Sequence, residues 1–305
     1  MSKSALHSIW VIGSINTDMV VKANSLPRPG QTIIGGEFFM NSGGKGANQA
    51  VAAARLGAEV SLLGCLGQDI FGDEAITQLK SEKINCSFVS RSENLPSGVA
   101  LINVDSTGEN QITVAPGANY SVGEQQVDLA FNSIEIGSLI LLQLEIPLAT
   151  VSHTIDLAQK HNCRVILDPA PAQSLSKQML QDLYLITPNE SEAEILTGIK
   201  IDSPESAESA AKHLLKMGVI NVAITIGSKG VFLANSEGYE IIPAPAVTAI
   251  DTTAAGDCFN GSLAAALANG RSLRDSIVFA CRAASIAVTR IGAQNSMPFQ
   301  QDLAP

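Results

Sequence analysis

The sequence has few aromatic residues, which limits the fold classes that it can adopt. Only 4% of its residues are Phe, Trp or Tyr, whereas 46% are hydrophobic overall. This balance favours parallel strands covered by small-faced helices over an aromatic-rich β-sandwich. The 305 residues are enough for a sizeable core, in one large α/β domain or in two smaller ones.

Basic residues and long apolar runs are also scarce. The chain carries 19 Lys and Arg against 29 Asp and Glu, a formal net charge of −10, and the basic residues are scattered. Binding along a nucleic acid would require a basic face, so we expect no nucleic-acid partner. No apolar run approaches the roughly 20 residues that a bilayer crossing needs, so we expect no membrane partner.

The cysteine pattern excludes two further classes. The five cysteines are odd in number, widely separated and free of any C-x-x-C pair. They therefore predict neither a disulfide framework nor a zinc site, and they favour the reducing cytoplasm. The first apolar run, residues 9–12, is too short for a signal peptide and predicts a first strand.

Apolar runs alternate with segments of helical period, as expected of β-α units that form a mostly parallel sheet. Strands are predicted at residues 60–63, 139–144, 164–167, 183–186 and 222–225. Helices are predicted at residues 47–56, 73–82, 148–161, 191–197, 205–217, 256–268 and 273–290. Glycines that suit a left-handed helix end follow four of them, at Gly57, Gly198, Gly218 and Gly270.

Two stretches interrupt this alternation. Residues 20–40 contain Pro27, Pro29 and Gly30 and predict strands and turns, and residues 97–114 predict a hairpin. Together they could form a small accessory sheet at the edge of the main domain. Such a sheet could cover a ligand, pair with a second subunit, or do both.

The densest glycine cluster, residues 42–49, runs directly into an alanine-rich helix. It is not a Walker A loop, because Phe39 stands where the first glycine belongs and Gly46 follows the lysine. It is not a dinucleotide fingerprint either, because Gln49 replaces the third glycine. The cluster is therefore either a tight structural turn or a place where a ligand approaches the backbone.

A second cluster, residues 251–257, leads into a helix of small residues. Those small residues leave N–H groups of the first helical turn uncovered, which suits an anion. Asp257 could simply complement the helix dipole. Alternatively, it could be a general base that takes a proton from a hydroxyl while the adjacent amides hold a phosphoryl group.

Three smaller features leave similar alternatives open. Asn16 and Asp18 follow the first strand, where open α/β sheets bind ligands, but they could form a turn. Asn189 and Glu192 match a helix cap, or oxygen ligands of hydrated magnesium. Residues 225–230 could admit a nucleotide phosphate or merely link two strands. The four histidines lie outside all these clusters, which argues against histidine catalysis.

Four of these motifs, at residues 13–18, 43–53, 187–192 and 251–257, occur together in an order that resembles the ribokinase family of PfkB carbohydrate kinases. The resemblance runs essentially end to end and implies one kinase domain over residues 1–305. It implies an α/β fold, a ribokinase-like three-layer α/β/α sandwich with a mostly parallel central sheet. It also implies a small β-sheet lid, from about residues 20–40 and 97–114, through which bacterial members dimerise.

The resemblance assigns roles to the residues of the motifs. It implies that sugar hydroxyls are held by Asn16, Asp18, Gly44, Lys45, Gly46, Asn48 and Glu145. Asp257 would be the catalytic base, in contact with the sugar, and the amides of Ala254, Ala255 and Gly256 would form the anion hole. Nucleotide contacts would come from Asn189, Thr225, Gly227, Ser228, Lys229, Gly230, Gly256, Asp257 and Cys281.

The resemblance also implies two metals. Glu192 would order the water molecules of Mg²⁺. A monovalent cation, usually K⁺, would lie beside the anion hole, near Asp251, Thr253, Ala287, Arg290, Gly292 and Ser296. Two residues depart from the commonest sequence of the family: Ala254 stands where many members have glycine, and Cys258 where threonine or another small residue is usual. Neither departure removes a reacting group.

The activity implied is ATP-dependent phosphorylation of D-ribose at its 5-hydroxyl, in a cytoplasmic homodimer. A sibling kinase for deoxyribose, another sugar or a nucleoside would use the same machinery. A non-catalytic sugar-binding protein is the alternative from another class, and the intact Asp257 motif argues against it. A nicotinamide-dependent oxidoreductase has little support, because the dinucleotide fingerprint fails.

Overall fold

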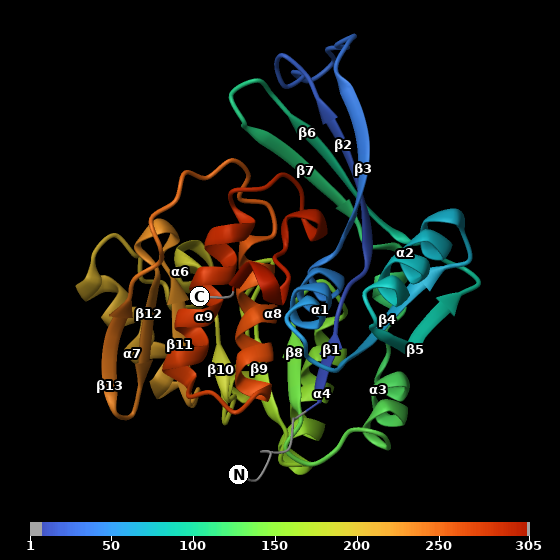
Figure 1. The fold of residues 1–305 in the computed structure, drawn as a ribbon. Coiled ribbons are helices and arrows are strands. Elements are labelled where there is room, and N and C mark those ends of the chain that lie inside the picture. The colour runs from blue at the N-terminus through green and yellow to red at the C-terminus, as the bar shows by residue number, and fades with distance from the viewer. Residues whose placement is uncertain (1–7, 304–305) are drawn as a thin grey trace.

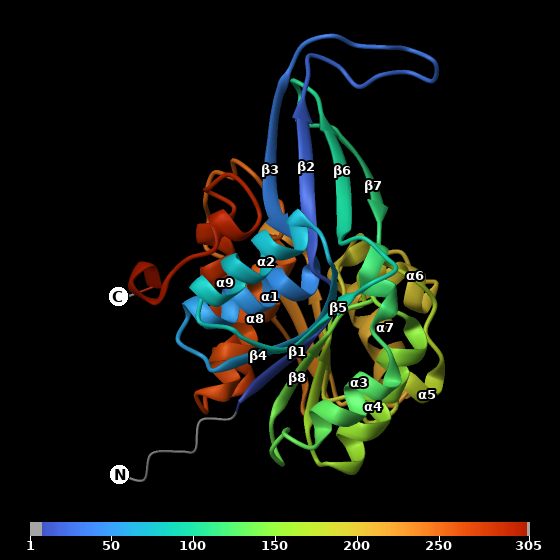
Figure 2. The same cartoon turned by 90° about the vertical axis from the view of Figure 1, so that its right-hand side faces the viewer.

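The computed structural model describes residues 8–303 and shows three layers. A large twisted sheet lies in the middle, with α1, α2, α8 and α9 on one face and α3 to α7 on the other (Figure 2). The α/β/α sandwich predicted from the sequence is therefore confirmed. A second, smaller sheet projects from the sandwich at the top of Figure 1.

Within residues 8–303 the large sheet has nine strands. In spatial order they are β13 (Gly238–Ile242), β12 (Val231–Asn235), β11 (Asn221–Thr225), β10 (Leu185–Ile186), β9 (Arg164–Leu167), β8 (Leu139–Leu142), β1 (Ile9–Ile12), β4 (Val60–Gly67) and β5 (Asn85–Ser92). All neighbours are parallel except the hairpins that add β12 and β13 at one edge. The sheet is thus mostly parallel, as expected.

Strand β1 shows why the sheet is buried on both faces. Ile9 and Val11 pack into one hydrophobic core, with α1, α8 and α9, whereas Trp10 and Ile12 pack into the other. Successive side chains of a strand point to opposite faces, so a run of four apolar residues supplies both cores. The same holds for β8, whose four residues are all fully buried.

The helices alternate with the strands. They are α1 (Lys45–Arg55), α2 (Ile70–Ser81), α3 (Glu124–Phe131), α4 (Leu148–Lys160), α5 (Lys177–Leu180), α6 (Glu190–Thr197), α7 (Pro204–Lys216), α8 (Ala255–Ala268) and α9 (Leu273–Ala287). Short 3₁₀ turns are η1 (Gly117–Ser121), η2 (Gly227–Lys229), η3 (Gln294–Ser296) and η4 (Gln300–Leu303). Among helices of the described residues, none has the length and apolar character needed to traverse a bilayer.

The predicted elements are confirmed with shifted ends. Gly57, Gly198, Gly218 and Gly270 all have positive φ, between 73° and 108°, which satisfies the left-handed helix ends inferred from the sequence. The helix predicted at 273–290 stops at Ala287, which leaves Arg290 outside it. The prediction of 139–144 as one strand was too long, since β8 ends at Leu142.

Four elements were not predicted. Strand β5 is half-exposed and rich in polar residues, and α3 and α5 are short, so none carries a clear apolar period. The hairpin of β12 and β13 follows the turn at 225–230, which links β11 to β12. Strands β5 and β13 lie at the two edges of the sheet and are only partly buried, so their sequence signal is weak. Strand β12 is buried, and its apolar run at residues 231–234 could have predicted it.

The small sheet consists of β3 (Glu37–Gly43), β2 (Asn16–Lys22), β6 (Gly98–Val104) and β7 (Asn110–Ala115), in that order. Strands β2 and β6 are parallel and the other two pairs are antiparallel. Both irregular stretches of the sequence therefore contribute strands to one sheet, as expected. We call this sheet the lid. Because β2 begins only four residues after β1 ends, the lid stands directly over the carboxyl ends of the central strands.

Candidate active site

The glycines of the 42–49 cluster let helix α1 approach the connection between β1 and β2. Gly44 is the N-cap of α1 with φ 87°, and a Cβ there would lie 2.6 Å from the backbone nitrogen of Asn16. A Cβ on Gly46 would lie 2.7 Å from the backbone of Gly13 and Ser14. Glycine is therefore required for packing at both positions. The same close approach places the start of α1 against the backbone of residues 13–16.

The N-terminus of α1 also binds Glu145, which follows the central strand β8. The Lys45 backbone N–H donates to Glu145 Oε2 at 3.1 Å, and the Ser14 hydroxyl donates to the same oxygen. Asp18 lies against the backbone of Gly43, where any side chain would collide with its carboxyl group. The residues predicted to hold sugar hydroxyls thus come from three separate segments and meet at one place.

The electrostatics of this place are unusual, because several carboxyl groups surround one lysine. Burial, followed by the charges of Glu145 and Asp257, raises the pKa of Asp18 to about 7. Burial alone would lower the pKa of the Lys45 ammonium, but the neighbouring carboxylates raise it above its ordinary value. Lys45 therefore stays charged. Clustered groups with perturbed pKa values are typical of functional sites.

Helix α8 begins with the predicted anion hole. Its N-cap, Ala254, has a left-handed backbone at φ 56°, which turns the chain sharply into the helix. A Cβ added to Gly256 would meet nothing within 4 Å, so there is open space beside this first turn. Within residues 8–303, the N–H groups of Ala254 and Gly256 have no acceptor, whereas the Ala255 N–H donates to Thr252 O at 3.2 Å.

Asp257 lies in the first turn of α8 and is buried, 4% exposed. Asn48 Nδ2 donates to its Oδ2 at 2.9 Å and Gln49 Nε2 donates to its Oδ1 at 3.2 Å. The start of α8 therefore meets α1 at this one carboxylate. The other amide atom of Asn48, the buried Oδ1, finds no donor among the described residues. A buried acceptor without a donor is the expected state of a group that binds a ligand hydroxyl.

The motif at 187–192 forms a helix cap, which is one of the two interpretations of its sequence. Asn189 Oδ1 accepts from the Glu192 N–H and Glu192 Oε2 accepts from the Asn189 N–H, each at 2.8 Å, a complete capping box. Glu192 is nevertheless buried, and burial raises the pKa of its carboxyl group despite the charge of Lys45. Its Oε1 remains available to a metal-bound water, so the residues fit the magnesium role as well.

The expected nucleotide segment lies beside this cap. Thr225 pairs with Asn189 in a parallel bridge, and its N–H donates to Pro188 O at 2.9 Å. The following turn, η2, exposes Gly227, Ser228 and Lys229 to solvent and ends at Gly230. Cys281 lies elsewhere, in the core-facing side of α9, where burial raises the pKa of its thiol to about 11. The turn is thus open to a ligand, whereas Cys281 is largely covered.

The residues expected around a monovalent cation are drawn together by Asp251. Its two carboxyl oxygens accept from the N–H groups of Thr253 and Gly292, each at 2.9 Å, and its own N–H donates to Val288 O. These bonds lower the pKa of Asp251 even though partial burial opposes them, so the carboxylate stays ionised. The rest of the set follows at the end of α9 and in the loop to η3: Ala287, Arg290, Gly292 and Ser296.

This set fits a potassium ion in its chemistry, since K⁺ in proteins is bound largely by backbone carbonyl oxygens. The Arg290 side chain is directed elsewhere, to Asp302 at 3.1 Å, and the Ser296 hydroxyl donates to Ala293 O at 2.8 Å. Arg290 could therefore contribute only through its backbone.

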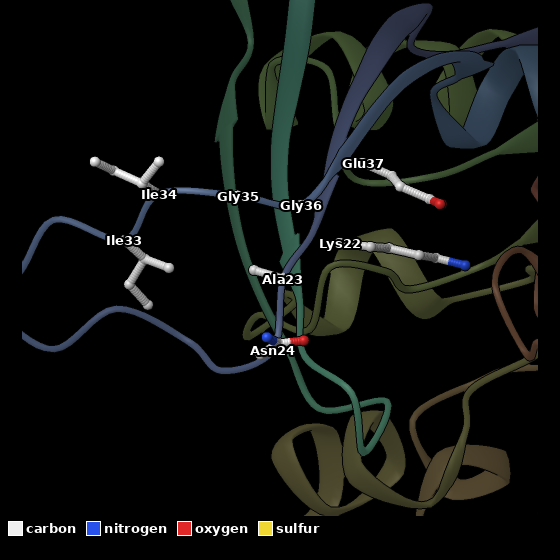
Figure 3. Close-up of a pocket in the computed structure, with 8 residues that line it drawn as sticks. All are labelled: Lys22, Ala23, Asn24, Ile33, Ile34, Gly35, Gly36 and Glu37. Atoms are coloured by element: carbon white, nitrogen blue, oxygen red, sulfur yellow. The ribbon is translucent and has the colours of Figure 1, made fainter.

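Two surface hollows lie apart from these residues. One, of about 300 Å³, lies at the far end of the lid between Lys22–Asn24 and Ile33–Glu37 (Figure 3). Figure 3 shows Lys22 and Glu37 pointing to one side and Ile33 and Ile34 pointing away from them. The other, of about 480 Å³, lies between α8, α9 and η4. Neither contains a residue of the four motifs, so the candidate active site is the place where those motifs meet.

A family model described as pfkB family carbohydrate kinase matches residues 6–300. The chain belongs to the pfkB family. It is 42% identical over 295 residues to the ribokinase of Haemophilus influenzae, covering 97% of this chain and 96% of that protein. It is 38% identical over 291 residues to the deoxyribokinase of Salmonella typhimurium, covering 95% of each.

The fold is shared as well. The structure of Arabidopsis thaliana ribokinase complexed with ribose and ATP superposes with a TM-score of 0.89 at 30% identity, over 97% of each chain. The chain is therefore a sugar kinase of the pfkB family, with its central sheet and its small lid sheet.

The structure adds four buried polar residues to the site, three of them outside the pfkB motifs and one, Gln49, inside the motif at 43–53 but without a role assigned to it. Asn119, in η1, donates to Asn16 Oδ1 at 2.7 Å and so holds that side chain in place. Gln143 donates to Gln49 Oε1 at 2.6 Å, and Gln49 in turn donates to Asp168 Oδ2 at 2.8 Å. Asp168 follows β9 directly, so the general position of ligand sites after parallel strands could have found it.

Proposed function

We propose that this protein transfers the γ-phosphoryl group of ATP to the 5-hydroxyl of D-ribose. One observation carries the proposal: Asp257 stands between Asn48 of the sugar motif and the acceptor-free N–H groups of Ala254 and Gly256. A base and an anion site share one turn of helix, which is the arrangement that attack of a hydroxyl on a phosphoryl group requires.

The sugar would be held by hydrogen bonds and oriented by charge. The donor-free Oδ1 of Asn48 accepts a sugar hydroxyl, and the charged Lys45 donates to another. Asn16, held by Asn119, and Asp18 approach from the first lid strand. The amides of residues 44–46 and the carboxylate of Glu145 complete the set. Because these groups are buried or half-buried and already positioned, the primary hydroxyl would be presented to Asp257 in one orientation.

Asp257 would then accept the proton of that hydroxyl as the oxygen attacks the γ-phosphorus. The charge that develops on the transferred group faces the first turn of α8, where the amides of Ala254 and Gly256 are free and the helix dipole is positive. The Ala255 amide would join them by leaving Thr252 O. Positioning and electrostatics supply the rate, since the chemistry needs no covalent intermediate with the protein.

The nucleotide would lie along Asn189 and the turn at Thr225, Gly227, Ser228, Lys229 and Gly230. Cys281, the remaining residue of the expected set, is largely covered within α9. Bound Mg²⁺ would neutralise charge on the phosphates, and Glu192 would hold its waters. Bound K⁺ would lie in the loops joined by Asp251, next to the first turn of α8. Asp251 orders that turn through the N–H of Thr253, one residue before Ala254.

The base is tested by Asp257→Asn, which keeps the shape and removes the proton acceptor. We expect kcat for ribose to fall about 10²- to 10⁴-fold, the usual worth of a general base. Asp128→Asn, at an exposed position on α3, is the matched control and should leave kcat unchanged. ADP release in the presence of ribose, ATP, Mg²⁺ and K⁺ is the measurement. Wild-type turnover by Asp257→Asn would reject the mechanism, and ribose binding without ADP release would indicate a non-catalytic sugar-binding protein.

The identity of the sugar is tested by a substrate panel. We expect kcat/KM for ribose to exceed that for deoxyribose, for other furanoses and for nucleosides, because ribokinases reach the higher identity among the relatives compared. A site that hydrogen-bonds a hydroxyl discriminates strongly against the analogue that lacks it. A higher kcat/KM for deoxyribose would assign the sibling activity to the same machinery.

We further propose that the lid joins two copies of the chain. Large apolar side chains of the lid are exposed, among them Leu101 at 50% and Ile112 at 55%, and all six residues of β7 are exposed. A long exposed edge strand is ordinarily covered. Sedimentation should therefore show a dimer that Leu101→Lys/Ile112→Lys converts to monomer, while Leu129→Lys on α3 leaves it intact. A monomeric wild-type protein would contradict this.

Two expectations complete the proposal. The whole chain would act as a single kinase domain, since the lid strand β2 begins, and the lid strand β3 ends, within motifs of the site. A cytoplasmic location remains a prediction, supported by five cysteines whose thiols are all free. Fractionation of the native source would test the second point, and limited proteolysis that releases no stable fragment would test the first.

A further inference from the structure

Asp168 is a buried carboxyl group that the proposed chemistry leaves without a role. It follows β9 at the carboxyl end of the sheet and is 6% exposed. No Lys, Arg or His of the described residues forms an ion pair with it. Burying a carboxyl group costs free energy unless other groups compensate it. A residue retained at such a cost needs a function that an apolar residue could not supply.

The side chain that Asp168 does contact is Gln49, which is fully buried. Gln49 Nε2 donates to Asp168 Oδ2 at 2.8 Å and to Asp257 Oδ1 at 3.2 Å. A side-chain amide has two N–H donors, so both are used. Its Oε1 accepts from Gln143 at 2.6 Å. These three contacts leave the amide one orientation, with one N–H directed at the candidate base.

Asp257 is consequently held at both of its oxygens by consecutive residues of α1. Asn48 bonds Oδ2 and Gln49 bonds Oδ1, so the plane of the carboxylate is fixed relative to the anion hole. Asn48 also faces the sugar, whereas Gln49 faces only protein groups. We propose that Asp168 and Gln49 are positioning residues that orient Asp257 for proton transfer, with Asp168 as the anchor.

The charge of Asp168 agrees with this role. Burial raises its pKa to about 8, and the charges of Asp257 and Glu192 act in the same direction while Lys45 opposes them. The surroundings of Asp168 therefore disfavour its charged form, and an asparagine would match it in shape without introducing a charge. An anchoring role needs an acceptor oxygen at this position, and asparagine supplies one.

The inference rests on the proposed function and predicts a specific kinetic pattern. Asp168→Ala and Gln49→Met should each lower kcat about 10- to 100-fold, the cost of a small misplacement of a reacting group. KM for ribose should change less than threefold, because neither residue is in the sugar set. Asp168→Asn should retain kcat within threefold. The double variant should be no slower than the slower single variant, because both changes release the same contact.

The test measures kcat and KM for ribose in these variants, with urea unfolding to confirm that each is folded. Thr154→Val, which removes a fully buried hydroxyl from α4 on the other side of the sheet, controls for the loss of any buried polar group and should keep full activity. If Asp168→Ala does not fold, Gln49→Met and Asp168→Asn decide the question. Asp257→Asn is measured alongside them.

Three results would overturn the inference: kcat of Asp168→Ala or Gln49→Met within threefold of wild type, a loss confined to KM, or equal damage from Asp168→Asn and Asp168→Ala. The first would show that the base needs no anchor, the second that these residues act on sugar binding, and the third that charge matters rather than the hydrogen bond. If Asp257→Asn abolishes turnover in the same series, only the inference fails. If Asp257→Asn remains active, the proposed mechanism fails with it.

Discussion

Strand β1 of the central sheet and strand β7 of the lid represent two opposite ways of forming a sheet. All four residues of β1 are buried, and all six residues of β7 are exposed. Strand β1 has helices on both faces, so hydrophobic burial stabilises it. Strand β7 is held by backbone pairing to β6 on one side only. The comparison teaches that burial of its own side chains stabilises the main α/β/α domain, whereas the stability of the lid depends on what covers its exposed strands.

The candidate active site lies where these two regions meet. Strand β2 begins with the buried Asn16 and ends at Lys22 in the lid, far from the core. The sugar-binding side chains that belong to the main α/β/α domain are thus fixed by packing. The position of those on strand β2 depends on the position of the lid. A lid with little internal packing is suited to moving between open and closed states.

The largest effect should come from paired truncations of one residue in each region. Leu141→Ala, in the fully buried β8, should lower the free energy of unfolding by about 2 to 5 kcal/mol. Ile112→Ala, in β7, should lower it by less than about 0.5 kcal/mol, because its side chain is 55% exposed. Urea unfolding of dilute protein measures both. A cost above about 1.5 kcal/mol for Ile112→Ala in protein diluted until it is monomeric would contradict the comparison and would show that the lid side chains are packed within a single chain.

A smaller effect should appear in the pH dependence of stability, at the junction of the two regions. The pKa of Asp18 is raised to about 7, so the folded protein holds a proton there that the unfolded chain releases near pH 4. Stability without ligand should fall as the pH rises from 4 to 7, because folding takes up this proton. Asp18→Asn should remove part of that slope and raise stability at pH 8 by about 2 to 4 kcal/mol.

Urea midpoints at pH 5 and pH 8 measure this effect. Asp73→Asn, at an exposed position on α2, is the control and should leave the slope unchanged. A slope that is identical in wild type and Asp18→Asn would show that Asp18 ionises normally in the folded protein. In that case Asp18, at the junction between the lid and the main domain, would be more exposed to water than the structure indicates.

The smallest effect concerns the turn into α8. Ala254 has φ 56°, a left-handed conformation that costs a non-glycine residue about 1 to 2 kcal/mol. Ala254→Gly should therefore stabilise the protein by about 0.5 to 1 kcal/mol, after the entropy that glycine gains in the unfolded chain is subtracted. Ala266→Gly, inside the same helix, should destabilise it by about 1 kcal/mol. Calorimetric Tm values distinguish the two variants. Equal changes in Tm of the same sign would show that the backbone at Ala254 is not strained.

Much of the site could be predicted from local sequence. The glycines before α1, the small residues before Asp257 and the Asn189 motif are all short-range patterns, and the structure places each at the start of a helix. For residues 187–192 the helix cap is confirmed, whereas the magnesium role of Glu192 stays a prediction, with one oxygen of Glu192 left outside the capping box. Local patterns are readable because a helix start is determined by its own few residues.

The support behind the site could not be predicted in this way. Asn119 bonds Asn16 from 103 residues away, and Gln49 bonds Asp168 and Asp257 across 119 and 208 residues. Each of these residues is an ordinary polar residue in its own segment. Their partners are defined only by the register of parallel strands and by the packing of α1 on α8.

The sequence by itself determined the alternation of strands and helices, the lid segments and the four motifs, because periodicity and cap residues act over a few positions. Only the tertiary structure decided which oxygen of Asp257 meets which amide, that Asp168 is buried behind Gln49, and that the lid strands remain exposed. Those facts depend on contacts between distant segments, which form once the two hydrophobic cores have fixed the sheet and its helices in place.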